Sequence, residues 1–390
     1  MVAQEKDLGP PSIGELLPLE EITIYISNDR ESPLVAKVAN TLKERVVGQD
    51  EACEVVARHV VMAEAGIVQP DRPKAVLFFL GPKGTGKTSM AKALAYYMFG
   101  EEAKKHLKII PCGEFEDSHS VYLLIGAPPG YIGHDDPPLI SAEFLQKPNI
   151  VVFDEIEKAD FALTYLLLNI MEEGKMMVSQ PSGPKSAMTH EVSFGQSILI
   201  FTSNIGSEDI QKYLKGTFGF VSSDQPVTDK SLESTAHRAL RRYYMGIPEF
   251  IDRVDDIVVF KQLRKEHYLQ IFQIAMAEQN GYMREQFIAP PMLKATERLA
   301  QYIVDKLDVR EGARQMRHVL KRTVWTPLAD LFLNQDMSGK EIQVDIVNGQ
   351  IQFSYLRAQE NTSGPTPKKP SPELEKAAAA AAKKKAKTAS

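Results

Sequence analysis

A glycine-rich segment carries the clearest chemistry in this sequence of 390 residues. Residues 81–88 (Gly-Pro-Lys-Gly-Thr-Gly-Lys-Thr) have the spacing G-x-x-x-x-G-K-[ST], and they stand between an apolar run at 75–80 and a helical pattern. In such a loop the glycines let backbone N–H groups turn toward phosphate oxygens, and the helix that follows presents its free N–H groups to the same anion. The sequence therefore predicts a nucleotide-phosphate site formed by Gly81, Pro82, Lys83, Gly84, Thr85, Gly86, Lys87, Thr88 and Ser89.

Two carboxylates are expected to complete this site. Lys87 would reach the β- and γ-phosphates of a nucleotide, and the hydroxyl of Thr88 would bind Mg²⁺. The apolar run at 150–153 ends in Asp154 and Glu155. In a chain that already has a phosphate-binding loop, this pair indicates one carboxylate that holds Mg²⁺ and a second that orients and polarises the attacking water. We therefore expect ATP and Mg²⁺ as the cofactors.

An amide follows another apolar run. Residues 198–202 are apolar and lead to Asn204, whose side chain could hydrogen-bond the γ-phosphate or the water, or could serve only a turn. The charges of Glu157 and Lys158, just beyond the carboxylate pair, are interpreted as surface charges that pair with each other. No chemistry is assigned to them.

The elements that must position these residues are read from hydrophobic periodicity. The runs at 75–80, 107–111, 150–153 and 198–202 are continuous, as in strands that are covered on both faces, and helical patterns lie between them. This alternation predicts an α/β fold with a doubly wound parallel sheet and a ligand at the carboxyl ends of the strands.

A second, smaller domain is expected after the sheet. Amphipathic helical patterns fill residues 263–335, and residues 341–353 read as a hairpin with an Asn-Gly turn. The predicted organisation is an amino-terminal extension without an assigned role (1–40), a large α/β domain (41–259), a mainly helical domain with the hairpin (260–357) and a disordered tail rich in Lys and Ala (358–390).

Composition excludes several classes of protein. The formal net charge of −5 argues against a dedicated nucleic-acid binder, which would normally show a basic face. The first residues lack the apolar core of a signal peptide, and no apolar run could span a bilayer. Cys53 and Cys112 lack the spacing of metal ligands, so two reduced thiols are expected. We expect a cytoplasmic protein that does not bind membranes.

In their order along the chain, these motifs resemble those of Clp-family AAA+ ATPases, and most of all the second ATPase module of ClpB and ClpC, from about residue 42 to residue 355. Besides the segments around residues 153–159 and 202–207, the resemblance rests on Val-Val-Gly-Gln-Asp-Glu-Ala at 46–52, Gly-Ala-Pro-Pro-Gly-Tyr-Ile-Gly at 126–133, Ile-Pro-Glu-Phe-Ile-Asp-Arg-Val-Asp at 247–255 and Glu-Gly-Ala-Arg at 311–314.

The resemblance implies roles that spacing alone does not supply. Val46 and Val47 would flank the adenine. Arg253 would be an arginine finger that projects toward the nucleotide of a neighbouring subunit, although without the resemblance its neighbours Asp252 and Asp255 favour a simple ion pair. Arg314 would contact the γ-phosphate in its own subunit and couple the nucleotide state to the angle between the domains.

Three further segments would act on proteins if the resemblance holds. Tyr131 would line an axial pore and grip a threaded polypeptide, and a second pore loop would lie at about residues 176–192. The segment Phe218-Gly219-Phe220 loosely fits the tripeptide by which protease-coupled relatives dock on a ClpP-like peptidase. A fold of the segment back onto its own core is the alternative.

The implied function is that of an ATP-driven protein unfoldase or remodelling chaperone. ClpB and ClpC carry further domains that this sequence does not contain, so a single homo-oligomeric ring is expected, a hexamer by family precedent, that threads protein substrates through its pore. Two alternatives stay open: the unfoldase partner of a ClpP-like peptidase, and a nucleotide-switched assembly factor for one dedicated complex.

Overall fold

A five-stranded parallel sheet forms the centre of the larger of two units in the computed structural model, which describes residues 32–69, 71–127, 137–183, 186–208, 229–308 and 312–355. The strand order is β2-β3-β6-β1-β7. These strands are β1 (Ala75–Leu80), β2 (Leu107–Pro111), β3 (Asn149–Asp154), β6 (Ser197–Ser203) and β7 (Asp256–Val259). The expected α/β fold with a parallel sheet is confirmed.

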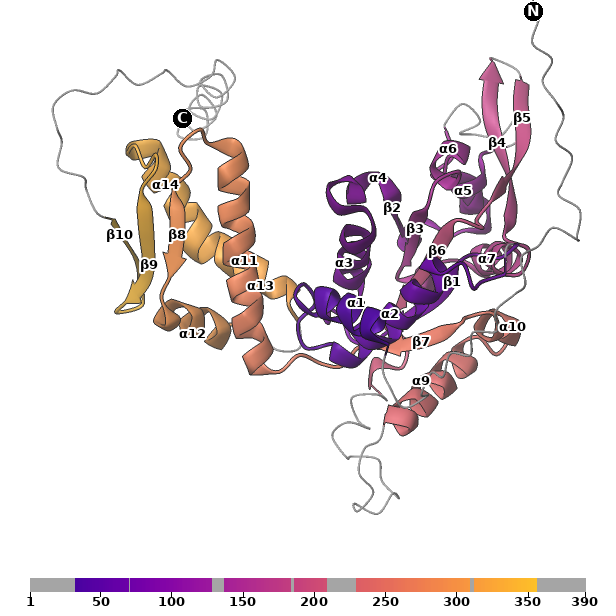
Figure 1. Cartoon of the computed structure of the whole chain (residues 1–390), viewed down its shortest axis with the longest axis horizontal. Coiled ribbons are helices and arrows are strands. Elements are labelled where there is room, and N and C mark those ends of the chain that lie inside the picture. Colours follow the sequence, from indigo (N-terminus) through magenta and orange to yellow (C-terminus); the bar gives the residue numbers. More distant parts are fainter. Residues whose placement is uncertain are drawn as a thin grey trace, which may run out of the picture.

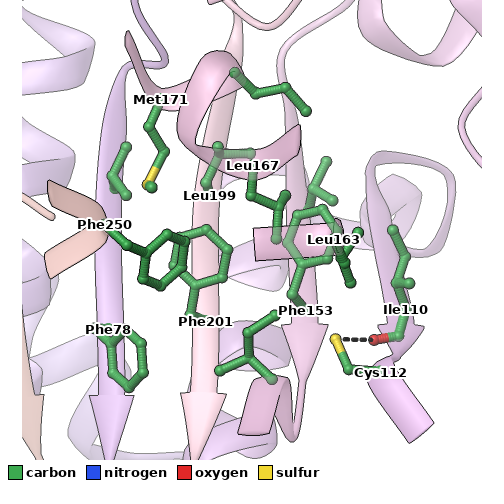
Figure 2. Close-up of a cluster of buried hydrophobic side chains, with 14 of the residues drawn as sticks. Phe78, Ile110, Cys112, Phe153, Leu163, Leu167, Met171, Leu199, Phe201 and Phe250 are labelled. Atoms are coloured by element: carbon green, nitrogen blue, oxygen red, sulfur yellow. Dashed lines mark hydrogen bonds between the residues drawn. The ribbon is translucent and has the colours of Figure 1, made fainter. Parts of the chain in front are cut away.

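Helices cover both faces of this sheet, which explains why its strands read as continuous apolar runs. Alternate strand residues such as Leu77 and Val152 pack under α1, α2 and α3, whereas Phe78 and Phe153 pack under α7, α9 and α10. Figure 2 shows the second layer, where Phe78, Phe201 and Phe250 lie close together. The helices of this unit are α1 (Pro33–Lys43), α2 (Asp50–Glu64), α3 (Lys87–Phe99), α4 (Ala103–His106), α5 (Tyr122–Ile125), α6 (Ala142–Leu145), α7 (Phe161–Glu173), α9 (Asp229–Tyr243) and α10 (Pro248–Asp252).

The smaller unit, drawn in orange to yellow in Figure 1, is mainly helical and has its own core. Its β9–β10 hairpin turns at Asn348 and Gly349, which both have positive φ, as the predicted Asn-Gly turn requires. The unit contains α11 (Lys265–Gln286), β8 (Met292–Ala295), α12 (Glu297–Asp305), α13 (Arg314–Leu320), a π-helical turn (Lys321–Trp325), α14 (Thr326–Asn334), β9 (Glu341–Val347) and β10 (Gln350–Tyr355).

Several elements differ from the sequence prediction. The short strand β7 was missed, and β8 adds a parallel third strand to the predicted hairpin. The segment expected as a loop at about 176–192 is a two-stranded antiparallel ribbon, β4 (Lys175–Gly183) and β5 (Ser186–Ser193), which extends away from the sheet in Figure 1. Helix α1 begins at Pro33, and its buried Val38 lies in the same core as α2 and α3.

Some predicted functional segments fall outside the described residues. These are Tyr131, the segment Phe218-Gly219-Phe220, most of the amino-terminal extension and the tail after residue 355. Among the described helices, none combines the length and the apolar composition needed to cross a bilayer.

Candidate nucleotide-binding site

The glycine-rich loop connects β1 to α3 and packs tightly on the rest of the sheet. A Cβ atom on Gly81 would lie 2.4 Å from the backbone oxygen of Phe260, so glycine is required there. Gly86 stands at the N-cap of α3 with a φ of 104°, and Lys87 and Thr88 open that helix. The loop therefore has the local geometry of a phosphate cradle at a helix N-terminus, as the motif predicts.

Lys87 is a buried cation held by neutral acceptors. Its side chain is 8% exposed, and Nζ donates to the carbonyl oxygens of Gly81 and Pro82 (2.5 and 2.9 Å) and to Oδ1 of Asn204 (3.0 Å). Burial lowers the pKa of Lys87 to about 8, and the carboxylates of Glu157, Asp154 and Glu155 oppose this shift. Because no salt bridge neutralises Lys87 within the described part of the chain, the site fits an anionic ligand.

A hydroxyl and a carboxylate meet beside Lys87. Thr88 Oγ1 donates to Asp154 Oδ1 at 3.1 Å, and Thr202 Oγ1 donates to the same oxygen at 2.6 Å. The described residues hold no group of three or more His, Cys, Asp or Glu that could bind a metal alone. Mg²⁺ commonly uses one or two carboxylates together with phosphates and waters, so the oxygens of Thr88 and Asp154 fit this ion.

Glu155 adopts an unusual backbone conformation directly after the end of β3. Its φ and ψ are 58° and 53°, in the left-handed region that residues other than glycine seldom adopt, and its N–H donates to Thr202 Oγ1 at 3.0 Å. A hydrogen bond from Lys158 lowers the pKa of Glu155. An ionised Glu155 can accept a proton or a hydrogen bond from a water molecule.

The interpretation of Glu157 and Lys158 as charges that pair with each other is wrong, whereas the expected surface position of Lys158 is confirmed. Lys158 pairs with Glu155, and Glu157 Oε1 accepts hydrogen bonds from both the backbone N–H and the Nδ2 of Asn204, at 3.1 and 3.0 Å. Glu157 lies in the 3₁₀ turn Ile156–Lys158, where its carboxylate is within hydrogen-bond distance of Asn204. Residue spacing alone gave no sign of this turn.

The smaller unit closes the other side of a cavity of about 400 Å³. Beside the loop residues 83–89, the cavity is lined by Asp154, Glu155 and Asn204, by Arg314, and by an apolar group consisting of Val46, Val47, Leu263, Ile271, Ile274 and Ala275. An apolar group opposite a phosphate cradle is suited to a planar base. Gly81 and Pro82 are not among the lining residues, but their carbonyl oxygens accept hydrogen bonds from Lys87.

Two backbone contacts join the units at this cavity. The N–H of Ala313 donates to the oxygen of Gly84 at 3.0 Å, and a Cβ on Gly312 would lie 2.6 Å from Gly84 Cα. On the large-unit side, the buried Gln49 donates to the oxygens of Thr85 and Lys261, at 3.0 and 2.8 Å. Sequence reasoning named Gln49 only within a longer motif and missed this link between the loop and the segment leading to α11.

Arg253 lies outside the cavity of its own chain. It follows α10 and pairs through Nη2 with Oε1 of Glu172 at 2.5 Å, and its backbone oxygen accepts a hydrogen bond from Arg72. Its Nε is buried with no hydrogen-bond partner among the described residues. The ion pair with Asp252 or Asp255 that the sequence favoured does not form, because Arg241 takes Asp252 and the backbone of Val76 takes Asp255.

Comparisons with known proteins agree with this architecture. Residues 72–257 match the family model "AAA domain (Cdc48 subfamily)", and residues 263–346 match "C-terminal, D2-small domain, of ClpB protein". The chain is 32% identical over 361 residues, 92% of its length, to the "ATP-dependent Clp protease ATP-binding subunit ClpC" of Staphylococcus saprophyticus subsp. saprophyticus. It is 33% identical over 343 residues, 87% of its length, to the protein of the same name from Staphylococcus aureus. The chain spans about two fifths of the length of these relatives (41% and 40%).

Proposed function

We propose that this chain, whose two matched domains are those of Clp-family AAA+ ATPases, hydrolyses ATP to remodel other proteins as a ring of identical subunits. The observation that carries the proposal is the convergence of Lys87, Asp154, Glu155 and Asn204 at the carboxyl ends of three neighbouring strands, β1, β3 and β6. This is the place where a parallel sheet binds its ligand.

Each residue of the site has a task in hydrolysis. Lys87 and the loop N–H groups bind the β- and γ-phosphates of ATP, and Thr88 with Asp154 holds Mg²⁺, which supplies charge neutralisation when bound. Glu155 orients a water molecule and accepts a hydrogen bond from it. Val46 and Val47 contact the adenine, and Arg314 contacts the phosphates from the smaller unit.

Arg253 completes the site of a neighbouring copy. Two observations support this assignment: Arg253 does not line the cavity of its own chain, and its side chain is 41% exposed at the surface. A ring of subunits, six by the precedent of the family, gives every Arg253 a nucleotide to contact. In this ring Tyr131 from each copy grips a polypeptide in the central pore, with the β4–β5 ribbon nearby. The proposed compartment is the cytoplasm.

The site assignment is tested with Glu155→Gln and Lys87→Ala. Glu155→Gln should bind a fluorescent ATP analogue normally and lose phosphate release by about 10²-fold or more, because the water is no longer oriented. Lys87→Ala should lose the binding itself. Glu102→Gln is a matched control, since Glu102 also pairs with a lysine three residues on but lies far from the cavity. Phosphate release at the wild-type rate by Glu155→Gln would contradict the proposal.

A second candidate is the unfoldase partner of a ClpP-like peptidase, favoured by the relatives named "ATP-dependent Clp protease ATP-binding subunit ClpC". Binding of the peptidase by the wild-type chain, and loss of binding with Phe218→Ser and Phe220→Ser, would support it. A dedicated assembly factor is distinguished by Tyr131→Ala. In a threading unfoldase, Tyr131→Ala should abolish threading while ATP hydrolysis continues. In a nucleotide-switched assembly factor, the same change should leave the activity intact.

A further inference from the structure

Asn204 is held by a carboxylate that no part of the proposed reaction uses. Its backbone N–H and its Nδ2 both donate to Glu157 Oε1, at 3.1 and 3.0 Å. The two residues stand at the tips of β3 and β6, which are neighbours in the sheet. The backbone oxygen of Glu157 in turn accepts a hydrogen bond from the hydroxyl of Tyr243, at the end of α9, at 2.8 Å. Glu157 is thus fixed from the side of the sheet that faces away from α3.

These contacts leave one orientation for the Asn204 amide. A carboxylate only accepts hydrogen bonds and an ammonium group only donates them. Glu157 therefore takes the NH₂ group of Asn204, and Lys87 takes its oxygen, at 3.0 Å. The face that Asn204 turns to the phosphate-binding loop is an acceptor. One of the two N–H groups of Nδ2 is engaged by Glu157, so the amide oxygen is the group directed at Lys87.

We propose that Glu157 is a positioning residue that presents Asn204 to the reaction as a hydrogen-bond acceptor. Resting on the proposed ATP hydrolysis, this assigns Asn204 Oδ1 to the Lys87 ammonium and to the attacking water.

The partial burial of Glu157 supports a dedicated role. Its Oε2 is buried and has no hydrogen-bond partner in the described part of the chain. A buried oxygen without a hydrogen-bond partner lowers the stability of the fold. A native protein keeps such an oxygen where the group has a function. The carboxylate also lies near enough to Lys87 to be the largest of the charges that raise the pKa of this lysine against the effect of burial. A solvated surface glutamate would have neither property.

Exchanging the carboxylate and the amide between positions 157 and 204 tests the proposal. Asn204→Asp keeps an acceptor for Lys87 but places a second carboxylate against Glu157, so we expect kcat for phosphate release to fall about 10²-fold. Adding Glu157→Gln supplies an NH₂ group that can donate to the introduced carboxylate, and kcat should recover at least about tenfold over Asn204→Asp alone. Glu157→Gln by itself keeps an acceptor oxygen for Asn204 but removes the charge that favours protonated Lys87, so its kcat should lie between those of wild type and Asn204→Asp.

A role for Asn204 as a hydrogen-bond donor predicts a different outcome for these variants. If Asn204 works by donating to a phosphate, no variant that removes its NH₂ group can recover, and a double variant as slow as Asn204→Asp overturns the proposal. Glu157→Ala should lower kcat and have no further effect in an Asn204→Ala background, whereas independent effects of the two changes would also overturn it.

One further measurement distinguishes a positioning role from a structural one. The melting temperature should be unchanged in Glu157→Gln, because a positioning role is exerted on the reaction. A large loss of stability in this variant would mean that Glu157 is structural, against the proposal. If the wild-type chain hydrolyses ATP and Glu155→Gln does not, the proposed function stands whatever the outcome of the swap.

Discussion

Lys87 and Arg253 are both cations held by acceptors of their own chain, yet their surroundings differ. Lys87 is 8% exposed and donates to two backbone carbonyls and an amide inside the cavity. The Arg253 side chain is 41% exposed and donates to a single carboxylate, Glu172, whose side chain is 50% exposed. One cation is part of a buried network, and the other is held at the surface by one contact.

This difference indicates where the site is complete and where it depends on another molecule. Every acceptor of Lys87 belongs to the sheet tips and the loop, so the phosphate cradle is built within one chain. A half-exposed ion pair contributes only about 0–1 kcal/mol, so Arg253 can exchange Glu172 for another anion at little cost. A phosphate group bound to a neighbouring copy would be such an anion.

Among the variants that test this comparison, those at Arg253 should show the largest change in the rate of ATP hydrolysis. Arg253→Ala should retain binding of a fluorescent ATP analogue and lose about 10³-fold or more in kcat for phosphate release, because a finger arginine acts on the transition state. Arg241→Ala is the matched control, since Arg241 is also exposed and ion-paired, with Asp252, close to Arg253. This variant should stay near the wild-type rate.

Mixing subunits decides whether the arginine acts across a boundary. Subunits with Arg253→Ala have an intact Glu155, and subunits with Glu155→Gln have an intact Arg253, so mixed rings should contain some complete sites and recover part of the turnover. Arg253→Ala subunits that hydrolyse ATP normally on their own would place the finger elsewhere.

The sequence predicted those parts of the fold and site that depend on local pattern. The runs at β1, β3 and β6 are apolar and buried on both faces, and the Asn348-Gly349 turn is specified by its own two residues. The loop motif likewise identified a cradle whose geometry comes from its own glycines. By contrast, β7 has only four residues and begins with Asp256, so its strand character comes from pairing with β1.

The errors around the site have a shared cause. Glu157 was taken for a surface charge because its burial is produced by Asn204, 47 residues away, and by Tyr243, 86 residues away. Arg253 was given nearby aspartates as partners, whereas Glu172 comes from a helix 81 residues earlier. The tertiary fold decides which charged side chains come together. The distances between segments that are far apart in the chain cannot be read from a single sequence.

The contact between the two units gives a prediction of intermediate size. A Cβ on Gly312 would lie 2.6 Å from Gly84 Cα and 2.7 Å from the oxygen of Lys83, both backbone atoms that cannot move cheaply. Gly312→Ala should therefore break the hydrogen bond from Ala313 to Gly84 and draw Arg314 away from the cavity. Loss of one charge-assisted contact predicts an ATP affinity roughly tenfold lower or more, measured by titration of a fluorescent analogue.

Gly339→Ala separates this clash from simple backbone strain. Gly339 lies in the same unit with nearly the same φ, 67° against 68°, and its Cβ would meet nothing within 4 Å. Both variants should lose a similar amount of stability from the left-handed backbone, but only Gly312→Ala should lose affinity. Equal affinities in the two variants would mean that the smaller unit does not adjust the loop.

The smallest effect is expected from Glu172→Gln, which removes the charge that holds Arg253 without touching Arg253. Since the pair is half-exposed, the free energy of unfolding should change by less than about 1 kcal/mol. An arginine that no longer has a competing anion should engage a neighbouring copy more readily, so ATP hydrolysis at limiting protein concentration should rise by up to about fivefold, the equivalent of 1 kcal/mol. Asp252→Asn removes a charge of similar exposure one residue from Arg253, but its partner is Arg241, and it should leave the concentration dependence unchanged. An equal rise in both variants would show that net charge alone promotes association, and no rise in either would mean that the contact with Glu172 does not compete with the neighbouring site.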